Sequence, residues 1–164
     1  IDYDLDKIPK EFFLTNKKLK IPKSKTQING EVKKIETEMD LWRYLKGKKN
    51  ELKVNKKLGY EYKYSEGEMI FPDNLEKPSR TIITGEGGQT PSRFKHVIQP
   101  NPDLAVFRRL MPKELESLNM FPTDHTKHEK VTDTKRAFFM GNALVVGVVE
   151  KIGIQLTKEI KLSL

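Results

Sequence analysis

Residues suited to ligand contact are concentrated between positions 84 and 95. Glycines at 85, 87 and 88 stand among hydrogen-bonding side chains, namely Thr84, Gln89, Thr90, Ser92, Arg93 and Lys95. Glycine lets the backbone approach a ligand closely, and these side chains offer donors for phosphates and base edges. The segment therefore predicts a loop that contacts DNA or RNA, although a glycine cluster after a strand is also typical of an ordinary loop.

Other chemistries have weaker support. The glycine loop is no dinucleotide fingerprint, because residue 90 is threonine, and no P-loop, because no Gly-Lys-Ser/Thr follows. No serine lies in a Gly-x-Ser-x-Gly elbow. His125 and His128 have the spacing of a helical metal-ligand pair, but a third ligand is lacking and a polar loop is the favoured interpretation. The chain has no cysteine, which excludes disulfides, thiolate metal sites and thiol catalysis within it.

The charge balance favours an anionic partner. The 164 residues include 31 lysines and arginines against 23 acids, a formal net charge of +8. Nucleic acid is the first candidate for such a surface. Lysine outnumbers arginine 25 to 6, and lysine is a point charge without arginine's bidentate geometry, so a merely solvated surface remains an alternative. The longest apolar run, Ala143 to Val149, is too short to cross a bilayer, and no membrane partner is expected.

The first hundred residues carry mostly strand and turn signals. Prolines and short apolar runs predict extended structure over residues 1–35, with a hairpin turn at Asn29-Gly30. A short helix is predicted over 38–47. Residues 60–64 alternate tyrosine and polar residues as a strand does, and the tyrosine face is interpreted as core rather than as a base-stacking platform.

Two further interpretations concern the flanks of the ligand-contacting residues. Strands are predicted at 80–84 and 94–98, so that the glycine loop forms a strand–loop–strand unit. The basic run 43–57 is interpreted either as a solvated loop or as a flank that contacts phosphates.

After Pro100 and Pro102 the pattern becomes helical. Proline at the first helical position predicts a helix over 112–118. Thr132 or Asp133 is expected to cap a second helix, which Gly141 ends, and Asn142 to cap a third that runs to about residue 158.

These segments resemble the closing motifs of the cytosine-C5 DNA methyltransferases. Arg109-Leu110-x-Pro112-x-Glu114, leading to Phe121-Pro122, is similar to the ninth family motif. Gly141-Asn142-Ala143 and the apolar residues after it are similar to the tenth, and Thr81-Ile82 resembles the threonine–aliphatic dipeptide of the target-recognition domain. Order and spacing agree over about residues 80–156.

The resemblance implies a role for each matching residue. Thr81 would touch the DNA backbone near the target cytosine, and the loop after it would read bases in the major groove. Asn142 and Ala143 would lie beside S-adenosylmethionine, while Arg109 and Glu114 would be structural. The expected DNA-binding residues are Arg80, Thr81, Thr84, Gly85, Glu86, Gly87, Gly88, Gln89, Thr90, Ser92, Arg93 and Lys95.

Two positions depart from the family pattern. Met111 stands where the family commonly has threonine, and Ser117 where it commonly has arginine. Both departures are expected to weaken the scaffold of the recognition domain.

The expected fold class is α+β. Residues 1–106 would form a small, mostly β target-recognition domain, and residues 107–164 a helical segment that docks on an absent Rossmann-like, S-adenosylmethionine-dependent methyltransferase domain. That missing domain or subunit would carry the nucleophilic cysteine. The sequence begins with Ile1 rather than methionine, so an excised piece or one subunit of a split enzyme is expected.

The expected function is sequence-specific recognition of double-stranded DNA within a DNA cytosine-5 methyltransferase of the bacterial cytoplasm, beside the nucleoid. The chain alone is expected to be inactive. The alternatives are a non-enzymatic basic DNA- or RNA-binding protein and a protein-interaction module whose lysines only solvate its surface.

Overall fold

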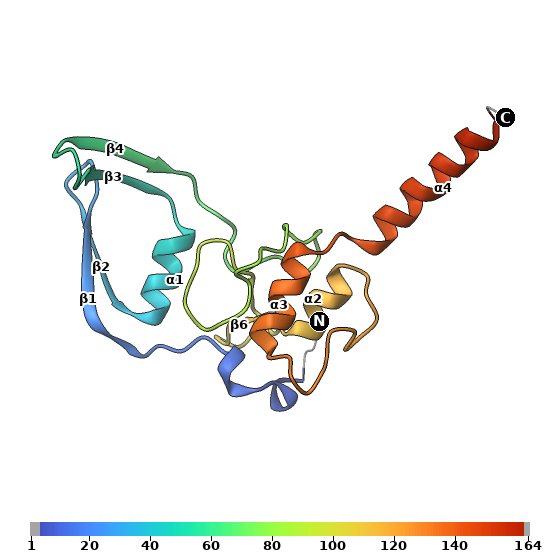
Figure 1. Cartoon of the computed structure of the whole chain (residues 1–164). Helices are drawn as coiled ribbons and strands as arrows, with labels where there is room; N and C mark the ends of the chain where they lie inside the picture. The colour runs from blue at the N-terminus through green and yellow to red at the C-terminus, as the bar shows by residue number, and fades with distance from the viewer. Residues whose placement is uncertain (1–3, 163–164) are drawn as a thin grey trace.

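Two antiparallel hairpins with a helix between them form one side of the molecule (Figure 1). The computed structural model describes residues 4–162. β1 (Lys18–Thr26) pairs with β2 (Val32–Thr37), and β3 (Lys49–Val54) pairs with β4 (Glu61–Glu66). Gly30 has a φ of +85° in the first turn, which confirms the hairpin predicted at Asn29-Gly30.

Helix α1 (Glu38–Lys46) confirms the helix predicted over 38–47. Thr37 accepts a hydrogen bond from the backbone of Asp40, and the Asp40 carboxylate accepts one from the backbone of Thr37, so the helix begins in a capping box. The Trp42 side chain is buried on the inner face of this helix.

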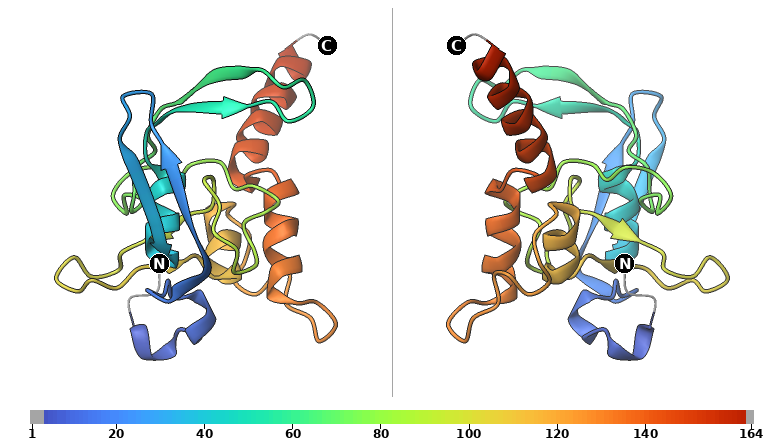
Figure 2. Two further views of the ribbon diagram at one scale, coloured as in Figure 1. Left: turned by 90° about the vertical axis from the view of Figure 1, so that its left-hand side faces the viewer. Right: turned by 90° about the vertical axis from the view of Figure 1, so that its right-hand side faces the viewer.

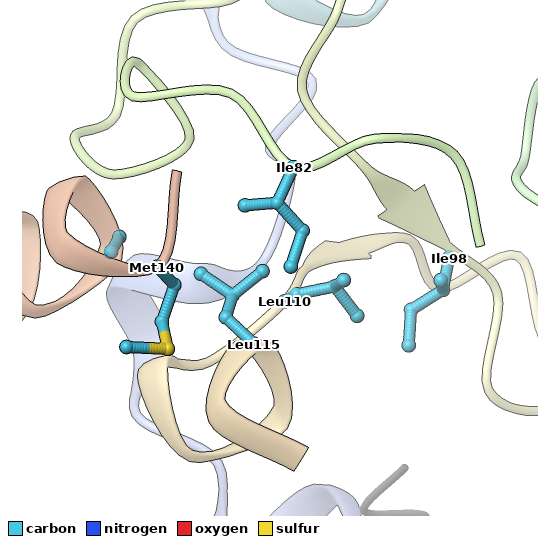
Figure 3. Close-up of a cluster of buried hydrophobic side chains, with 6 residues drawn as sticks. Ile82, Ile98, Leu110, Leu115 and Met140 are labelled. Carbon is cyan, nitrogen blue, oxygen red and sulfur yellow. The ribbon is translucent and has the colours of Figure 1, made fainter. Parts of the chain in front are cut away.

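The main hydrophobic core lies between the 80–98 segment and the C-terminal helices. Strand β5 (Val97–Ile98) pairs with β6 (Arg108–Arg109), followed by α2 (Pro112–Leu118) and α3 (Asp133–Asn142). Figure 3 shows the side chains that these segments bring together, Ile82, Ile98, Leu110, Leu115 and Met140. The core therefore joins residues from both sides of position 106.

A second, smaller cluster fixes the N-terminal segment. The 3₁₀ turns Leu5–Lys7 and Lys10–Phe12 place Ile8 and Phe12 against Met111 at the start of α2. Mixed helices and small sheets make the fold α+β, as expected.

Helix α4 (Val146–Leu162) projects away from the rest of the molecule (Figures 1 and 2). Its large apolar side chains are exposed, including Ile152 at 62% and Leu156 at 59%. The stretch Asp133–Leu162, which includes α3, α4 and the non-helical residues 143–145 between them, is long and apolar enough to span a membrane by length and composition alone. The uninterrupted apolar run Ala143 to Val149 is only a part of this longer segment, which the sequence pattern did not indicate.

Several local predictions were also wrong. Residues 80–83 form no ladder, and only Val97–Ile98 of the predicted return strand pairs. The isoleucine at 82 packs in the core instead. The basic run 43–57 is not a loop, since it ends α1 and forms β3. Tyr60 and Tyr62 are exposed rather than in the core.

The helix boundaries near 141 also differ from the prediction. Gly141 lies inside α3, and Asn142 ends that helix instead of capping α4. The Asn142 amide donates to the carbonyl oxygen of Phe138 at 3.0 Å, which keeps its side chain within α3. Helix α4 begins four residues later, where the Val146 N–H donates to the carbonyl oxygen of Asn119.

Candidate nucleic-acid interface

The predicted DNA-contacting loop is packed directly against α3. A Cβ atom on Gly87 would lie 2.8 Å from the Cα of Thr134, and one on Gly141 would overlap the backbone of Ile83 and Thr84. These two glycines therefore allow the loop backbone and the helix to touch. Gly87 was predicted to contact a ligand. In the structure, its lack of a side chain allows the loop to pack on α3.

Buried polar contacts fix the base of this loop. The Glu86 carboxylate accepts a hydrogen bond from the backbone N–H of His96 at 2.5 Å. The same carboxylate lies 3.2 Å from the ring nitrogen Nδ1 of His96. The opposite ring nitrogen of His96 lies 3.1 Å from the Ser79 hydroxyl. Glu86 and His96 are buried, so both act here as supports of the loop.

Arg80 forms a two-pronged ion pair with Asp73 just before the loop. Its Nε and Nη2 donate to the two Asp73 carboxylate oxygens at 2.7 and 3.1 Å. Burial raises the pKa of Asp73, but hydrogen bonds from Arg80 and the Val97 N–H outweigh burial and hold that pKa below its ordinary value. The guanidinium of Arg80 is thus already engaged within the chain.

The other two basic residues predicted to bind DNA, Arg93 and Lys95, also make contacts within the chain. Lys95 is buried, which lowers its pKa, and its Nζ donates to the carbonyl oxygens of Gly88 and Thr90 at 3.1 and 2.8 Å. Arg93 lies 3.1 Å from the Glu66 carboxylate and donates to the carbonyl oxygen of Leu45 at 2.8 Å. Lys95 thus fixes the conformation of the loop, and Arg93 connects the loop to the region of α1 and β3.

Fewer candidates remain accessible to a ligand. Among the expected DNA-binding residues, those exposed to solvent are Thr81, Thr84, Gly85, Gln89 and Thr90. Ser92 and Gly88 are half-buried, and Gly88 has a φ of +76°. The neutral donors and the glycine of the loop thus face solvent, while its charged residues hold it in place.

The two expected cofactor residues lie at the end of α3. Asn142 is exposed, and Ala143 is half-buried. Ala143 lines a cavity of about 400 Å³ together with Thr81, Asn119 and Leu144. The structure therefore brings Thr81 and Ala143, which are 62 positions apart in the sequence, to the walls of one cavity.

Two buried arginines hold the ninth-motif segment, and one of them connects it to the loop. Arg108 donates to both carboxylate oxygens of Glu114 at 2.8 Å, and both side chains are buried. Arg109 donates to the carbonyl oxygen of Gly88 at 2.6 Å, and its guanidinium lies 5.2 Å from the centre of the Phe12 ring. Sequence reasoning missed Arg108, although an Arg–Glu pair six residues apart at a helix start was the available signal.

The two family departures lie in different environments. Met111 makes no side-chain cap hydrogen bond, but its buried side chain packs on Ile8 and Phe12. Ser117 is exposed on α2 and its hydroxyl donates to the carbonyl oxygen of Lys113.

The histidine pair forms no metal site in this structure. The His125 ring lies tilted against the Phe121 ring with centres 5.0 Å apart, and His128 accepts a hydrogen bond from the backbone N–H of Lys130. Within residues 4–162, no group of three or more His, Cys, Asp or Glu side chains is arranged to hold a metal ion. The polar-loop interpretation of this segment fits these contacts.

Comparison with known proteins identifies the family. Residues 4–158 match the family described as C-5 cytosine-specific DNA methylase. The chain belongs to this family. It is also similar to the Type II methyltransferase M.Sau3AI of Staphylococcus aureus, with 42% identity over 121 residues, or 74% of this chain. The aligned part is 27% of that relative, so the chain spans only about a quarter of its length. No solved structure matches the chain.

The family is described as DNA methylases specific for C-5 of cytosine. The match begins at residue 4, so it includes the hairpins as well as the loop and the C-terminal helices. The hairpins are therefore part of the family domain.

Proposed function

We propose that this chain is the DNA-reading part of a split or truncated DNA cytosine-5 methyltransferase. Residues 1–106 would form the target-recognition domain, and residues 107–164 would complete the catalytic domain. A separate domain or subunit would supply the nucleophilic cysteine, which this sequence lacks. The complete enzyme would transfer a methyl group to C5 of cytosine in double-stranded DNA, in the bacterial cytoplasm beside the nucleoid.

One observation carries this proposal beyond family membership. The loop expected to read bases and the helix expected to reach the cofactor form a single packed unit, because Gly87 and Gly141 bring the loop against α3. A methyltransferase must hold the target base and the methyl donor in a fixed relation, since small errors in position cost large factors in rate. Direct loop–helix packing provides such rigidity.

The accessible donors of the loop fit base reading. Gln89 can donate and accept toward the edge of adenine, and threonine can contact either base edges or phosphates. The carbonyl oxygens of Gly88 and Thr90 are bound by Lys95, so the backbone on both sides of Gln89 is held while its side chain stays exposed. We propose Thr81, Thr84, Gln89 and Thr90 as the direct DNA contacts, and Arg80, Glu86, Arg93 and Lys95 as positioning residues.

The residues present fit one wall of an S-adenosylmethionine site. The exposed carboxamide of Asn142 can exchange hydrogen bonds with a polar ligand, and Ala143 and Leu144 present an apolar wall beside it. S-adenosylmethionine, when bound, supplies the methyl group. Asn142 and Ala143 would close the pocket that the missing domain mainly forms.

Capture of the native protein tests this function. An antibody to this chain would isolate it from its source cells, and the captured material would be assayed for methyl transfer from labelled S-adenosylmethionine to duplex DNA. Label on C5 of cytosine, with a longer chain or a second polypeptide in the captured material, is the expected result. An intact chain captured alone and without activity would contradict the proposal.

Substitution of loop residues tests the reading role. In the active enzyme, Gln89→Ala and Thr84→Ala should change which sites are methylated, with about 1–3 kcal/mol less discrimination for each lost base contact. Sequencing of the methylated sites is the measurement. Thr123→Ala, at an exposed position in the loop after α2, is the control and should leave site choice unchanged.

A non-enzymatic basic DNA- or RNA-binding protein is the second candidate, favoured by the net charge of +8. Its binding would fall steeply with salt and show little sequence preference. In that case Gln89→Ala would weaken all sites similarly.

A further inference from the structure

Several cations near the core are held in ion pairs, whereas surface lysines such as Lys53 and Lys63 form none among the described residues. Near the core, Lys46, Lys49, Arg80, Arg93, Arg108 and Arg136 each lie within 4.0 Å of a carboxylate. The β1–β2 hairpin differs. Residues 17–37 contain seven lysines and two glutamates, and within the described part of the chain none of these lysines forms an ion pair. Residues 17–37 therefore carry five of the eight net positive charges.

The register of the hairpin brings like charges together. Lys25 lies directly opposite Lys33, and Lys34 lies opposite Ser24 on the next pair. Like charges directly opposite each other on neighbouring strands destabilise a sheet. An anion bound between the two lysines would reverse this destabilisation, because both ammonium groups would be attracted to the anion.

The hairpin is also held at a fixed position relative to the base-reading loop. The Ile28 N–H at its turn donates to the carbonyl oxygen of Asn50 in β3 at 2.8 Å, and Gln27 pairs with Glu51. The α1–β3 region is in turn tied to the loop through Arg93 and the Lys46 ammonium, which donates to the carbonyl oxygen of Lys95. The lysines therefore stand at a set distance from the exposed residues of the loop.

We propose that the β1–β2 hairpin is a second DNA-contact surface, which binds duplex phosphates outside the sequence that the loop reads. Lys23, Lys25 and Lys33 form its centre, since they are close in register on the paired strands. This inference rests on the proposed DNA-reading function. Phosphate contacts position a protein on DNA and carry no sequence information, so the hairpin raises affinity and the loop sets the choice of site.

The test compares charge variants of the full chain, together with the polypeptide that completes the enzyme. In Lys23→Gln/Lys25→Gln/Lys33→Gln, the negative slope of log K against log salt for a duplex containing the site should become shallower by about 2–3. Each lost phosphate contact reduces the magnitude of the slope by about 0.9. Site preference should stay unchanged. The variant should also lose the parent's stronger binding to long duplexes over short ones.

Two further variants separate charge from structure. Lys23→Arg/Lys25→Arg/Lys33→Arg keeps the charges and should keep the parent slope. Lys10→Gln/Lys130→Gln/Lys135→Gln removes the same charge from exposed positions outside both the hairpin and α4, and should change the slope little.

The outcomes distinguish the two proposals. If the parent complex has no DNA affinity, the DNA-reading function itself fails. If the parent reads its site and the glutamine variant keeps the parent slope, the hairpin proposal is overturned. In that case, aggregation of the glutamine variant would show that the lysines have a different role. Together with Pro22 they would keep the exposed strand edges from pairing with other chains.

Discussion

At the scale of single residues, small side chains and buried charges decide how the loop is held. Gly87 and Gly141 permit a loop–helix contact that a Cβ atom would block. Glu86, Arg93 and Lys95 look like ligand-binding residues in the sequence, yet their polar groups are used within the chain. Accessible recognition is left to uncharged donors such as Gln89 and Thr84.

Gly141→Ala should destabilise the protein by about 1–3 kcal/mol, because the added methyl group overlaps the backbone of Ile83 and Thr84, which cannot rotate away as a side chain can. Urea unfolding measures the change. Gly153→Ala is the matched control, since Gly153 is also helical and nothing lies within 4 Å of its missing Cβ. That control should be neutral or slightly stabilising, as alanine favours helix. Equal stability of parent and Gly141→Ala would refute the loop–helix contact.

At the scale of elements, helix α1 is joined to the loop by its last residue. Lys46 is buried, its ammonium donates to the carbonyl oxygen of Lys95, and Asp73 lies 4.0 Å away. Burial outweighs the carboxylate and lowers the pKa of Lys46 to about 8. The helix therefore contributes a titratable contact to the base of the recognition loop.

The stability of the fold should rise as pH increases from about 8 to 10. In this range the unfolded chain keeps its proton on Lys46, whose ordinary pKa is 10.5, while the folded chain loses it. The folded state then binds fewer protons, so the free energy of unfolding grows with pH, on the order of 2 kcal/mol. Lys95 acts in the same direction, whereas Tyr44, whose pKa is raised by burial, opposes the rise as pH approaches and passes 10.

Lys46→Met should reduce this rise, as urea unfolding at several pH values would measure. Methionine keeps most of the apolar stem, and the Lys95 carbonyl oxygen retains a hydrogen bond from Arg80 at 3.3 Å. Lys48→Met changes an exposed neighbour and should leave the pH dependence as in the parent. A rise of the same size in Lys46→Met would show that Lys46 is not its source.

At the scale of the whole molecule, α4 has no partner within the described residues that would cover its apolar side chains. It is linked to the body through the Val146 N–H and the close contact of Gly147 with Met120. A run of exposed apolar residues of this length is uncommon on a protein that acts alone. The relative M.Sau3AI is much longer than this chain, which agrees with a proposed docking surface for a missing domain.

The isolated chain should therefore self-associate or bind a hydrophobic dye. Ile152→Lys/Leu156→Lys, which replaces two exposed apolar residues one helical turn apart, should weaken dye binding and reduce self-association measured by light scattering. Gln155→Lys/Thr157→Lys adds equal charge at polar positions and should bind dye as the parent does. A parent chain that is monomeric and dye-silent would contradict the proposed missing partner.

Local sequence rules determined the features that depend on neighbouring residues. The Asn29-Gly30 turn, the short helix over 38–47 and the proline start of α2 were predicted because each depends mainly on residues that are close in the sequence. The motif residues indicated the family before any comparison, and the absence of cysteine was evident in the sequence itself.

Only the tertiary structure decided the features that depend on long-range contacts. Residues 80–83 favour a strand by type, but the burial of Ile82 against α2 and α3 leaves them unpaired. Asn142 is a good cap by type, yet its amide bonds back to Phe138. Arg93 is held by Glu66 and by the carbonyl oxygen of Leu45, which are distant in the sequence, and Lys95 is held by the carbonyl oxygen of Gly88 across a turn. A sequence pattern does not specify such distances, so it could not show whether these two side chains are available to a ligand.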